Sequence, residues 1–328
     1  MTEKSVVQML LPDPVLAAFD LPLRARFYPF GFPFDLATNS SHVIQAAQEG
    51  WGQFRQQFDA APVRMHLGVM AGGNTQMPPE SVCRSREHLM FFAADSENFA
   101  VCDFQQNFAF GWINQVVAAD HGVVRYRFLT AAGLTLIEQQ SGASLHCGLV
   151  VRNGSGVALM GDSFAGKSTL SYACARAGWT FVSDDGVLVV RDRADRYSAG
   201  DPYTIRLRED AGRLFPELQD RMPVKRPNGK MGIEIFTSEL GIQSTPGCSI
   251  DHIVFLNRNE SGAARIRRYP KDDALSWCER YVTFGARETR DAQIRCYERL
   301  MTAGIWEMRY SHLDDAISRL EQLVDFGD

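Results

Sequence analysis

The chain lacks the features that mark membrane proteins and proteins that coat nucleic acids. No apolar run among its 328 residues approaches membrane-spanning length, and the short apolar stretch near the N-terminus is broken by Pro12 and Pro14. Such a broken stretch is not typical of a signal peptide. The formal net charge is −5, which offers no general attraction to nucleic acid or to an anionic membrane. We therefore expect a cytoplasmic protein without a membrane or nucleic-acid partner.

Regularly spaced cysteines are missing too. The seven cysteines are scattered, odd in number and include no CxxC pair. Zinc sites and disulfide frameworks both depend on such spacing, so we expect reduced and mostly buried thiols. The sequence also shows no internal repeat and no low-complexity linker.

The composition that is present fits a soluble globular protein, with 45% hydrophobic and 22% charged residues. The length fits two domains or one large one. The polar break "QQSGAS" predicts a boundary between a first domain at 1–140 and a second at 141–328.

The first part is expected to be a β-rich α+β domain, and its sequence assigns it no role. Residues 40–54 carry Val43, Ala47 and Trp51 on one helical stripe behind a serine cap, and residues 113–120 also favour a helix. The predicted strands are "VRMHLGVM", "EHLMFFAA", "NFAVCDF", "NFAFGWI" and "VVRYRFL". They predict a curved, mostly antiparallel sheet, whose aromatic residues form its core or else a binding face.

The second part opens with the pattern of a nucleotide-binding loop. We expect a strand in "LHCGLVV", a hairpin turn at the Asn-Gly pair that follows, and a strand "VALM" that runs into "GDSFAGKS". The next helix carries Leu170, Ala173, Cys174 and Ala177 on one face, and Gly178 is placed to end it. Strand, glycine loop and helix form the context of a P-loop.

The chemistry of this loop follows from its composition. Gly161 and Gly166 allow backbone angles that side chains disfavour, so the loop amides can form a nest for phosphate oxygens beside the positive end of the helix dipole. Lys167 is expected to reach the β- and γ-phosphates and Ser168 to hold Mg²⁺. The ring of Phe164 is expected to point away from the nest. The expected ATP-binding residues are Gly161, Asp162, Ser163, Phe164, Ala165, Gly166, Lys167, Ser168 and Thr169.

Two adjacent acids, Asp184 and Asp185, interrupt the apolar run at 179–190, which is predicted to be one strand. Successive strand side chains point to opposite faces, so regular geometry lets only one acid approach the phosphates. Carboxylates inside an apolar segment are costly to bury without partners. A functional site explains the pair better than a solvated turn does, and the sequence does not separate the two roles.

These segments together resemble the catalytic domain of HPr kinase/phosphorylase, a bacterial P-loop protein-serine kinase. In that family a strand with "LHG" precedes the loop G-D/E-S-G-x-G-K-S, and "ADD" follows the helix. This chain has "LHCG", "GDSFAGKS" and "SDD" at similar spacing. The resemblance covers residues 145–190 and is faint beyond them. It implies an α/β P-loop kinase domain that uses ATP and Mg²⁺.

The resemblance also implies catalytic roles. Asp185 or Asp184 would accept the proton of the acceptor hydroxyl. Lys167 would neutralise charge that develops during transfer, and His146 would steady the base or a phosphate.

Further ligand contacts come from weaker matches. The family's "PVRPGR" segment has a counterpart in "PVKRPNGK", which makes Lys230 a phosphate contact. The family's "EIRG" stretch, which supplies a metal-binding glutamate, has no clear match, and Glu209 lies nearest to its place. The metal ligands expected are therefore Ser168, Asp184 and Glu209. Arg206 is expected either to contact an anionic acceptor or to belong to an exposed arginine face.

The rest of the second part is expected to be scaffold. Residues 250–258 predict a buried strand, and helices are expected at 271–284, 288–303 and 311–326.

We interpret the sequence as an ATP-dependent kinase whose acceptor is a hydroxyl of a protein, a peptide or a small metabolite. A nucleotide hydrolase, in which the acids orient water, is the first alternative. A nucleotide-binding sensor that has lost turnover, through Phe164 or the missing "EIRG", is the second. The sequence leaves homo-oligomerisation open.

Overall fold

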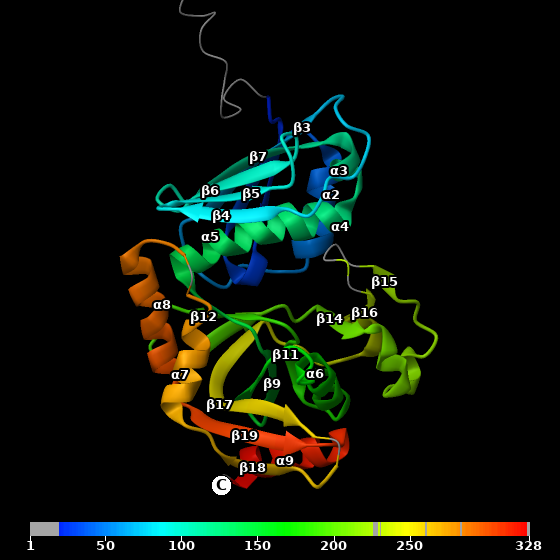
Figure 1. Ribbon diagram of the computed structural model, residues 1–328, viewed down its shortest axis with the longest axis vertical. Coiled ribbons are helices and arrows are strands. Elements are labelled where there is room, and N and C mark those ends of the chain that lie inside the picture. The colour runs from blue at the N-terminus through cyan, green and yellow to red at the C-terminus, as the bar shows by residue number, and fades with distance from the viewer. Residues whose placement is uncertain (1–19, 226–228, 230, 260, 283, 327–328) are drawn as a thin grey trace, which may run out of the picture. The chain divides into compact units, whose positions relative to one another are not determined.

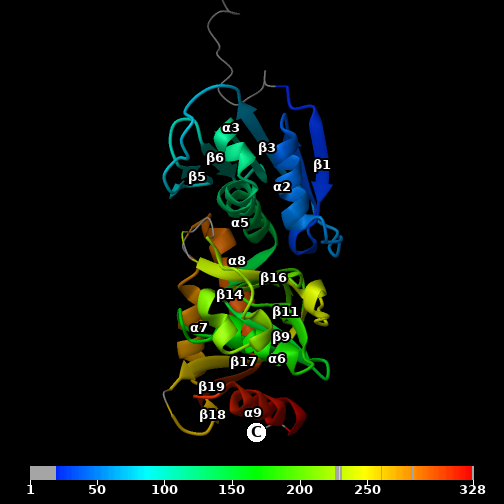
Figure 2. The same cartoon turned by 90° about the vertical axis from the view of Figure 1, so that its right-hand side faces the viewer.

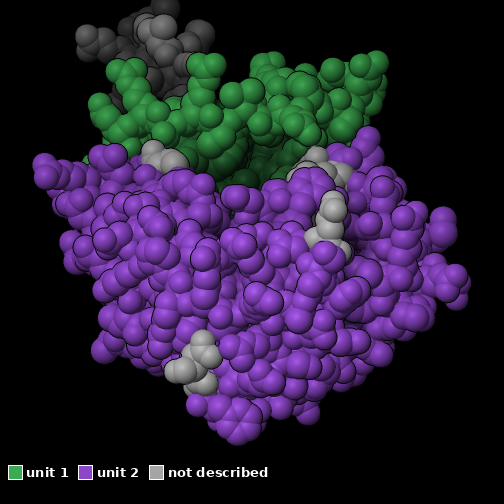
Figure 3. All heavy atoms as spheres, turned by 60° about the horizontal axis from the view of Figure 1, so that its bottom comes forward, with its two compact units in different colours: residues 1–140 green, residues 141–328 purple. Residues whose placement is uncertain are grey.

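The computed structural model describes residues 20–225, 229, 231–259, 261–282 and 284–326. The chain divides into two compact units, called unit 1 (residues 1–140) and unit 2 (residues 141–328) below (Figure 3). Among the described residues, no helix combines the length and the apolar character that a bilayer crossing requires. All seven cysteines are free thiols, and only Cys83 is exposed.

Unit 1 contains a mixed sheet that has seven strands within its described residues. Strands β2, β3 and β7 run parallel, and the other neighbouring pairs are antiparallel, so the predicted mostly antiparallel sheet is confirmed. Their spatial order is β1 (Leu23–Phe27), β2 (Phe34–Thr38), β3 (Val63–Met70), β7 (Phe108–Asn114), β6 (Phe99–Asp103), β5 (Leu89–Ala93) and β4 (Val82–Arg86).

Helices cover one face of this sheet (Figure 2). They are α2 (Ser41–Trp51), α3 (Gln115–Ala119), α4 (His121–Val123), a π-helical stretch (Val124–Thr130) and α5 (Ala131–Ser141). The predicted stripe on α2 is confirmed, because Val43, Ala47 and Trp51 are all buried. The opposite face of the sheet carries arginine and aromatic side chains.

The predicted strand "VVRYRFL" is wrong, because this segment is helical. Val123, Val124, Phe128 and Leu129 are its buried apolar residues, and that spacing fits a helical face rather than the alternation of a strand. The carboxylate of Asp120 accepts a hydrogen bond from the Val123 amide at 3.0 Å and starts the helical run. The helix α5 that follows was not predicted either.

Unit 2 contains a sheet that has nine strands within the described residues. Strands β10, β17 and β19 run parallel, so their carboxyl ends lie at one edge. The main path is β11 (Thr180–Ser183), β9 (Gly148–Arg152), β10 (Ser155–Met160), β17 (Gly247–Arg258), β13 (Tyr197–Gly200), β12 (Val187–Val190) and β8 (Gly142–Leu145), with β19 (Gly304–Tyr310) between β17 and β18 (Arg265–Arg268).

Helices lie on both faces of this sheet (Figure 1). On one face, α7 (Lys271–Glu279) and α8 (Arg287–Leu300) pack in a core with Leu149 and Ala158. On the other, α6 (Lys167–Arg176) and α9 (Leu313–Phe326) pack in a core with Val150 and Val157. Neighbouring residues of β9 and β10 thus enter opposite cores, which explains their continuous apolar sequence. The expected α/β architecture of the second part is present, with the predicted helices at slightly shorter bounds.

A second, smaller sheet belongs to unit 2 as well. It contains β14 (Thr204–Arg208), β16 (Met231–Phe236) and β15 (Val224–Lys225) in that order. Ile205 and Leu207 of β14 pack in one core with Tyr172 of α6. This contact brings the end of β14 close to the helix that follows the glycine loop.

The strand predicted for "LHCGLVV" is two strands. β8 ends at Leu145 and β9 begins at Gly148, so His146 lies in the connection between them. The predicted hairpin turn after β9 is confirmed, since Asn153 and Gly154 both have positive φ, 50° and 81°, as a two-residue turn of this kind requires.

Candidate functional site

The glycine loop connects the carboxyl end of β10 to the first residue of α6, as predicted. Three loop residues have positive φ, namely Gly161 at 142°, Phe164 at 74° and Gly166 at 95°. A Cβ on Gly161 would lie 2.9 Å from the Ala165 Cβ, and one on Gly166 would lie 2.3 Å from the Tyr310 hydroxyl oxygen. Side chains are therefore excluded at both glycines by space as well as by backbone conformation.

Lys167 begins α6 and folds back over the loop. Its ammonium donates hydrogen bonds to the carbonyl oxygens of Gly161 at 2.8 Å and Asp162 at 3.2 Å. Burial lowers the pKa of Lys167, and the carboxylate of Asp185 opposes that shift more than any other group. The lysine charge is thus held at the loop without a direct carboxylate partner among the described residues.

The hydroxyl of Ser168 points toward the second predicted segment. It donates a hydrogen bond to the backbone carbonyl of Asp184 at 3.2 Å, which ties the start of α6 to the connection after β11. Thr169 and Ala165 are half-buried, whereas Asp162, Ser163 and Phe164 are exposed. The residues of the predicted loop are therefore gathered at the N-terminus of one helix.

The segment 179–190 is not one strand, and this part of the prediction is wrong. β11 ends at Ser183 and pairs with β9, whereas β12 begins at Val187 and pairs with β8 and β13. The Ser183 hydroxyl donates to the Gly186 carbonyl at 2.7 Å and accepts from its amide at 3.3 Å, which closes a turn. Asp184 and Asp185 lie in that turn, so strand alternation does not set their directions.

Asp184 is the buried member of the pair, with 1% of its surface exposed. Its carboxylate accepts a hydrogen bond from the backbone amide of Arg206 at 3.1 Å. Burial raises the pKa of Asp184 to about 7, although the nearby Arg206 charge partly opposes the shift. The guanidinium of Arg206 pairs at 3.2 Å with Asp201, whose pKa partial burial also raises.

Asp185 is the exposed member, with a side chain that is 64% accessible. One of its carboxylate oxygens lies 3.4 Å from the Nδ1 atom of His146, which comes from the connection between β8 and β9. The structure therefore brings Asp185 and His146 together from separate parts of the sequence, and Asp185 faces solvent beside the charge of Lys167.

The remaining predicted contacts are less well placed. Arg206 is engaged by Asp201 and lies beside Asp184, so its charge already has partners. Glu209 is exposed at the start of a 3-10 helix, and no hydrogen bond or ion pair joins it to another of the residues that the structure describes. Lys230 lies outside the described residues.

Sequence reasoning missed two residues that shape the loop. Arg208, at the end of β14, places its guanidinium carbon 3.7 Å from the centre of the Phe164 ring. Tyr310, at the end of β19, donates a hydrogen bond to the Ala165 carbonyl at 3.0 Å. The ring of Phe164 is 74% exposed, in agreement with the expectation that it points away from the loop. Neither contact has a local sequence signal, because both strands are far from the loop in sequence.

A divalent cation fits part of this arrangement. Magnesium commonly takes one or two protein oxygens and completes its shell with phosphate and water, and the Ser168 hydroxyl at the start of α6 suits that role. Asp184 instead directs its carboxylate to the Arg206 amide. In the described part of the chain, no group of three or more histidine, cysteine or acidic residues is arranged to hold a metal ion.

Comparison with known proteins adds little to this geometry. No family model matches the sequence, and no curated protein matches it. Among solved structures, the chain is similar to "Structure of the Hpr(Ser) kinase/phosphatase from Coxiella burnetii" at 12% sequence identity, covering 56% of this chain and 97% of that chain with a TM-score of 0.29. A similarity this low transfers neither the fold nor the activity of that protein to this chain.

Proposed function

We propose that unit 2 is an ATP-dependent phosphotransferase that moves the γ-phosphoryl group of Mg-ATP to a hydroxyl of a protein, a peptide or a small metabolite. The observation that carries the proposal is the solvent-facing carboxylate of Asp185 beside the P-loop lysine. A phosphate-binding loop alone would suit many proteins. A solvent-exposed carboxylate beside the loop adds a proton acceptor, which transfer to a hydroxyl can use.

The nucleotide side of the proposal rests on the loop. Positive φ at Gly161 and Gly166 and the N-terminus of α6 supply the backbone geometry that cradles phosphates. The ammonium of Lys167 would exchange its two loop carbonyls for phosphate oxygens. Ser168 would hold Mg²⁺, which when bound neutralises charge on the β- and γ-phosphates.

The transfer step needs only the groups already named. The acceptor oxygen forms a bond to the γ-phosphorus, the bond between that phosphorus and the β,γ-bridging oxygen breaks, and ADP leaves with the electron pair. The hydroxyl proton passes to the Asp185 carboxylate and then to solvent. His146, at 3.4 Å from Asp185, holds that carboxylate in place.

The sequence order "LHC", "GDSFAGKS", "SDD" also supports a kinase of the HPr kinase type. In this reading the 141–328 domain is catalytic. The exposed position of Asp185 and the buried position of Asp184 support Asp185 as the base in this proposal.

The test is incubation of the whole chain with γ-labelled ATP and Mg²⁺ in the presence of a cell extract as the acceptor source. Label on a protein or metabolite is the expected result. Free phosphate alone would favour the hydrolase, and saturable binding without turnover would favour the sensor. Either result would overturn the kinase.

Two variants sharpen this test. Lys167→Ala is expected to remove Mg-ATP binding and transfer while leaving the fold intact, because the lysine charge serves the phosphates. Asp185→Asn is expected to keep nucleotide affinity but to lower transfer by about 10²–10⁴-fold, the usual contribution of a general base. Asp210→Asn, which neutralises an exposed acid outside the proposed site, is the matched control. Normal transfer by Asp185→Asn would remove Asp185 from the mechanism.

A further inference from the structure

The face of the unit 1 sheet opposite its helices carries a group of cationic side chains on β1 and β3. In one row across the sheet, Arg26 of β1 stands opposite Asp35 of β2, which stands opposite Arg64 of β3. In the next row on the same face, Arg24 of β1 stands opposite Ala37 of β2, which stands opposite His66 of β3. The strand register, rather than closeness in sequence, therefore gathers these groups.

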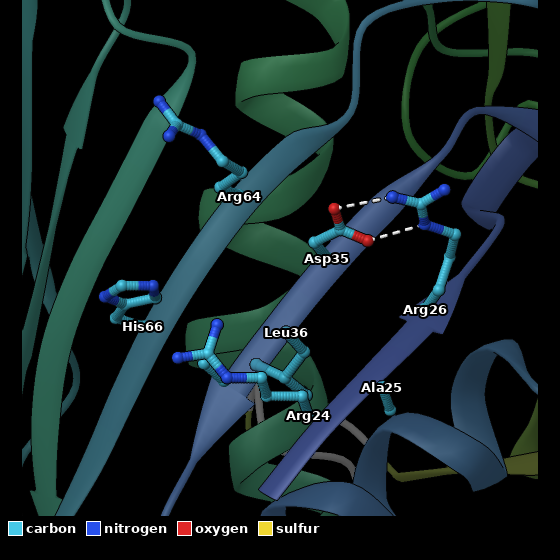
Figure 4. Close-up of a pocket in the computed structure, with 8 residues that line it drawn as sticks. Arg24, Ala25, Arg26, Asp35, Leu36, Arg64 and His66 are labelled. Atoms are coloured by element: carbon cyan, nitrogen blue, oxygen red, sulfur yellow. Dashed lines mark hydrogen bonds and ion pairs between the residues drawn. The ribbon is translucent and has the colours of Figure 1, made fainter. Parts of the chain in front are cut away.

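These side chains surround a shallow hollow of about 360 Å³ (Figure 4). Its lining is Arg24, Ala25, Arg26, Asp35, Leu36, Ala37, Arg64 and His66. The figure shows Arg24 of β1 and Arg64 and His66 of β3 projecting on the same side of the sheet. The hollow lies wholly within unit 1 and is separate from the P-loop residues.

The charge in this hollow is only partly balanced. Asp35 is occupied by Arg26, whose Nε and Nη2 atoms donate to its two carboxylate oxygens at 2.6 and 2.8 Å. Among the described residues, no carboxylate forms an ion pair with Arg24 or Arg64. Arg64 donates one hydrogen bond to the Gln106 carbonyl at 3.2 Å, and its guanidinium carbon lies 5.7 Å from the centre of the Phe108 ring.

Both arginines act on the same imidazole. Burial lowers the pKa of His66, and the charges of Arg24 and Arg64 lower it further. The fields of the two guanidinium groups therefore converge at His66. An anion placed there would be attracted by both.

We propose that this hollow binds a phosphomonoester group, carried by a small metabolite or by a phosphorylated side chain. Two arginines that form no ion pair with a described carboxylate match a group whose charge is between −1.5 and −2 at neutral pH, about twice that of one carboxylate. Guanidinium groups bind phosphate oxygens in pairs through two parallel N–H donors. Strands β1 and β3 are separated by β2 and hence by about 10 Å, a gap that two arginine side chains can close around one phosphate.

The overall charge of −5 does not oppose this site. At about 8–10 Å, screening by salt limits the reach of distant acids at physiological ionic strength. The local group has three arginines and one aspartate, and that aspartate is already paired. The short range of the field also favours a small phosphorylated group over a long polyanion.

Phosphoserine, glycerol phosphate and a short phosphoserine peptide are suitable probes, with free serine as the control that lacks the phosphate group. Calorimetric titration of the whole chain is expected to show binding of at least one phosphomonoester and none of serine. The free compounds and the peptide distinguish a metabolite ligand from a phosphorylated side chain. Equal affinity for sulfate and citrate would show unspecific anion binding and would overturn the proposal.

Variants locate the site. Arg24→Ala and Arg64→Ala are each expected to weaken binding about tenfold or more, since a hydrogen bond to a charged group contributes that much. Arg84→Ala and Arg86→Ala on β4 are the matched controls, because they remove the same charge from the same face four strands away from β3. Lys167→Ala tests whether the phosphomonoester binds at the P-loop instead, and it is expected to leave the affinity for the phosphomonoester unchanged. Equal loss in all arginine variants would overturn the proposal.

The signal of His66 gives an independent readout. A bound dianion is expected to raise the pKa of His66, which NMR titration of its ring protons measures directly. The charged groups that face His66 are Arg24 and Arg26 of β1, Asp35 of β2 and Arg64 of β3, while β7 presents Phe108 and Phe110. An unchanged pKa of His66 at saturating ligand would place the ligand elsewhere.

Discussion

Phe164 is the residue at which this loop departs most from a glycine-rich pattern. Its φ of 74° lies in the left-handed region, where a bulky residue costs about 1–3 kcal/mol. The exposed ring buries little surface in return, and its described partner is the guanidinium of Arg208. A cation above an exposed ring contributes about 0.5–1 kcal/mol. The contact therefore offsets only part of the strain, and we infer that the ring serves to hold Arg208 over the loop.

A double-mutant cycle tests this pairing. Phe164→Gly and Arg208→Ala, alone and combined, are expected to give a coupling free energy of about 0.5–1 kcal/mol in urea unfolding. Phe164→Gly combined with Arg213→Ala is the control, since Arg213 is an exposed arginine five residues further along. A coupling of zero in the first cycle would mean that the cation and the ring do not interact in solution.

The buried carboxyl of Asp184 predicts a pH dependence of stability. Its pKa is about 7 in the folded chain against an ordinary value of 3.8, so the folded state holds the proton more tightly than the unfolded state. The contribution of Asp184 to the free energy of unfolding is therefore complete below pH 4 and falls as the pH rises to 7. Asp201 contributes with the same sign.

Asp184→Asn isolates this contribution. Urea unfolding at pH 5 and pH 8 is expected to show a smaller loss of stability with rising pH in the variant than in the parent chain. Asp185→Asn serves as the comparison, because that carboxylate is largely exposed. An equal pH dependence in Asp184→Asn and the parent would show that Asp184 ionises normally.

The sequence predicted the loop and the helix after it better than it predicted the three-dimensional surroundings of the two acids. The residue types and spacing of the loop, from Gly161 to Ser168, predicted the strand, turn and helix that the structure contains. Different directions for the two acids were also expected, but from strand alternation, whereas the pair lies in a turn between β11 and β12. The ion pair of His146 with Asp185 follows from the pairing of β8 with β12, in which Leu145 lies opposite Val187, and no local pattern shows that pairing.

At the scale of elements, the end of β19 contacts the glycine loop through Tyr310. The Tyr310 hydroxyl donates to the Ala165 carbonyl and occupies the space in front of Gly166. A methyl group on Gly166 would lie 2.3 Å from that hydroxyl oxygen but 3.7 Å from the nearest ring carbon. The clash thus comes from one oxygen atom that can be removed.

This geometry predicts a partial rescue. Gly166→Ala is expected to destabilise unit 2 through both the clash and the positive φ of 95°. Adding Tyr310→Phe removes the clash and is expected to restore part of the lost free energy of unfolding, although Tyr310→Phe alone destabilises by about 1 kcal/mol through the lost hydrogen bond. Additive losses in the double variant would show that Tyr310 does not confine position 166.

The wrong predictions of secondary structure fall on segments whose local sequence pattern is compatible with two structures. The segment 123–129 contains aromatic and β-branched residues that favour a strand, but packing against α2 selects a helix. The run 179–190 is mostly apolar apart from its acids, Thr180 and Ser183, and such runs do not reveal where one strand ends and another begins. The turn at Ser183 and Gly186 depends on hydrogen bonds that the sequence does not display.

For the whole molecule, the net charge gives no sign of the arginine cluster on one face of the unit 1 sheet. A net charge of −5 correctly describes the chain but not the sheet face of unit 1 opposite its helices, where the strand register collects arginines from β1 and β3. The aromatic residues of unit 1 divide in the same way. Phe34 and Phe92 belong to the core, whereas Phe91, on the same strand as Phe92, is 40% exposed. Charge and aromatic content therefore bear on binding only once the pairing of strands is known.

The proposed sites belong to different units, and this separation predicts how each ligand acts on the chain. Mg-ADP at about 100 times its Kd is expected to stabilise the state that binds it by about 2.7 kcal/mol. In hydrogen exchange, this protection is expected in residues 161–169 and 183–186, and Lys167→Ala is expected to abolish it. Arg24→Ala and Arg64→Ala are expected to leave it intact, because they alter unit 1 alone. Mg-ADP protection confined to β1 and β3, or lost equally in all three variants, would contradict the assignment of the nucleotide to the glycine loop.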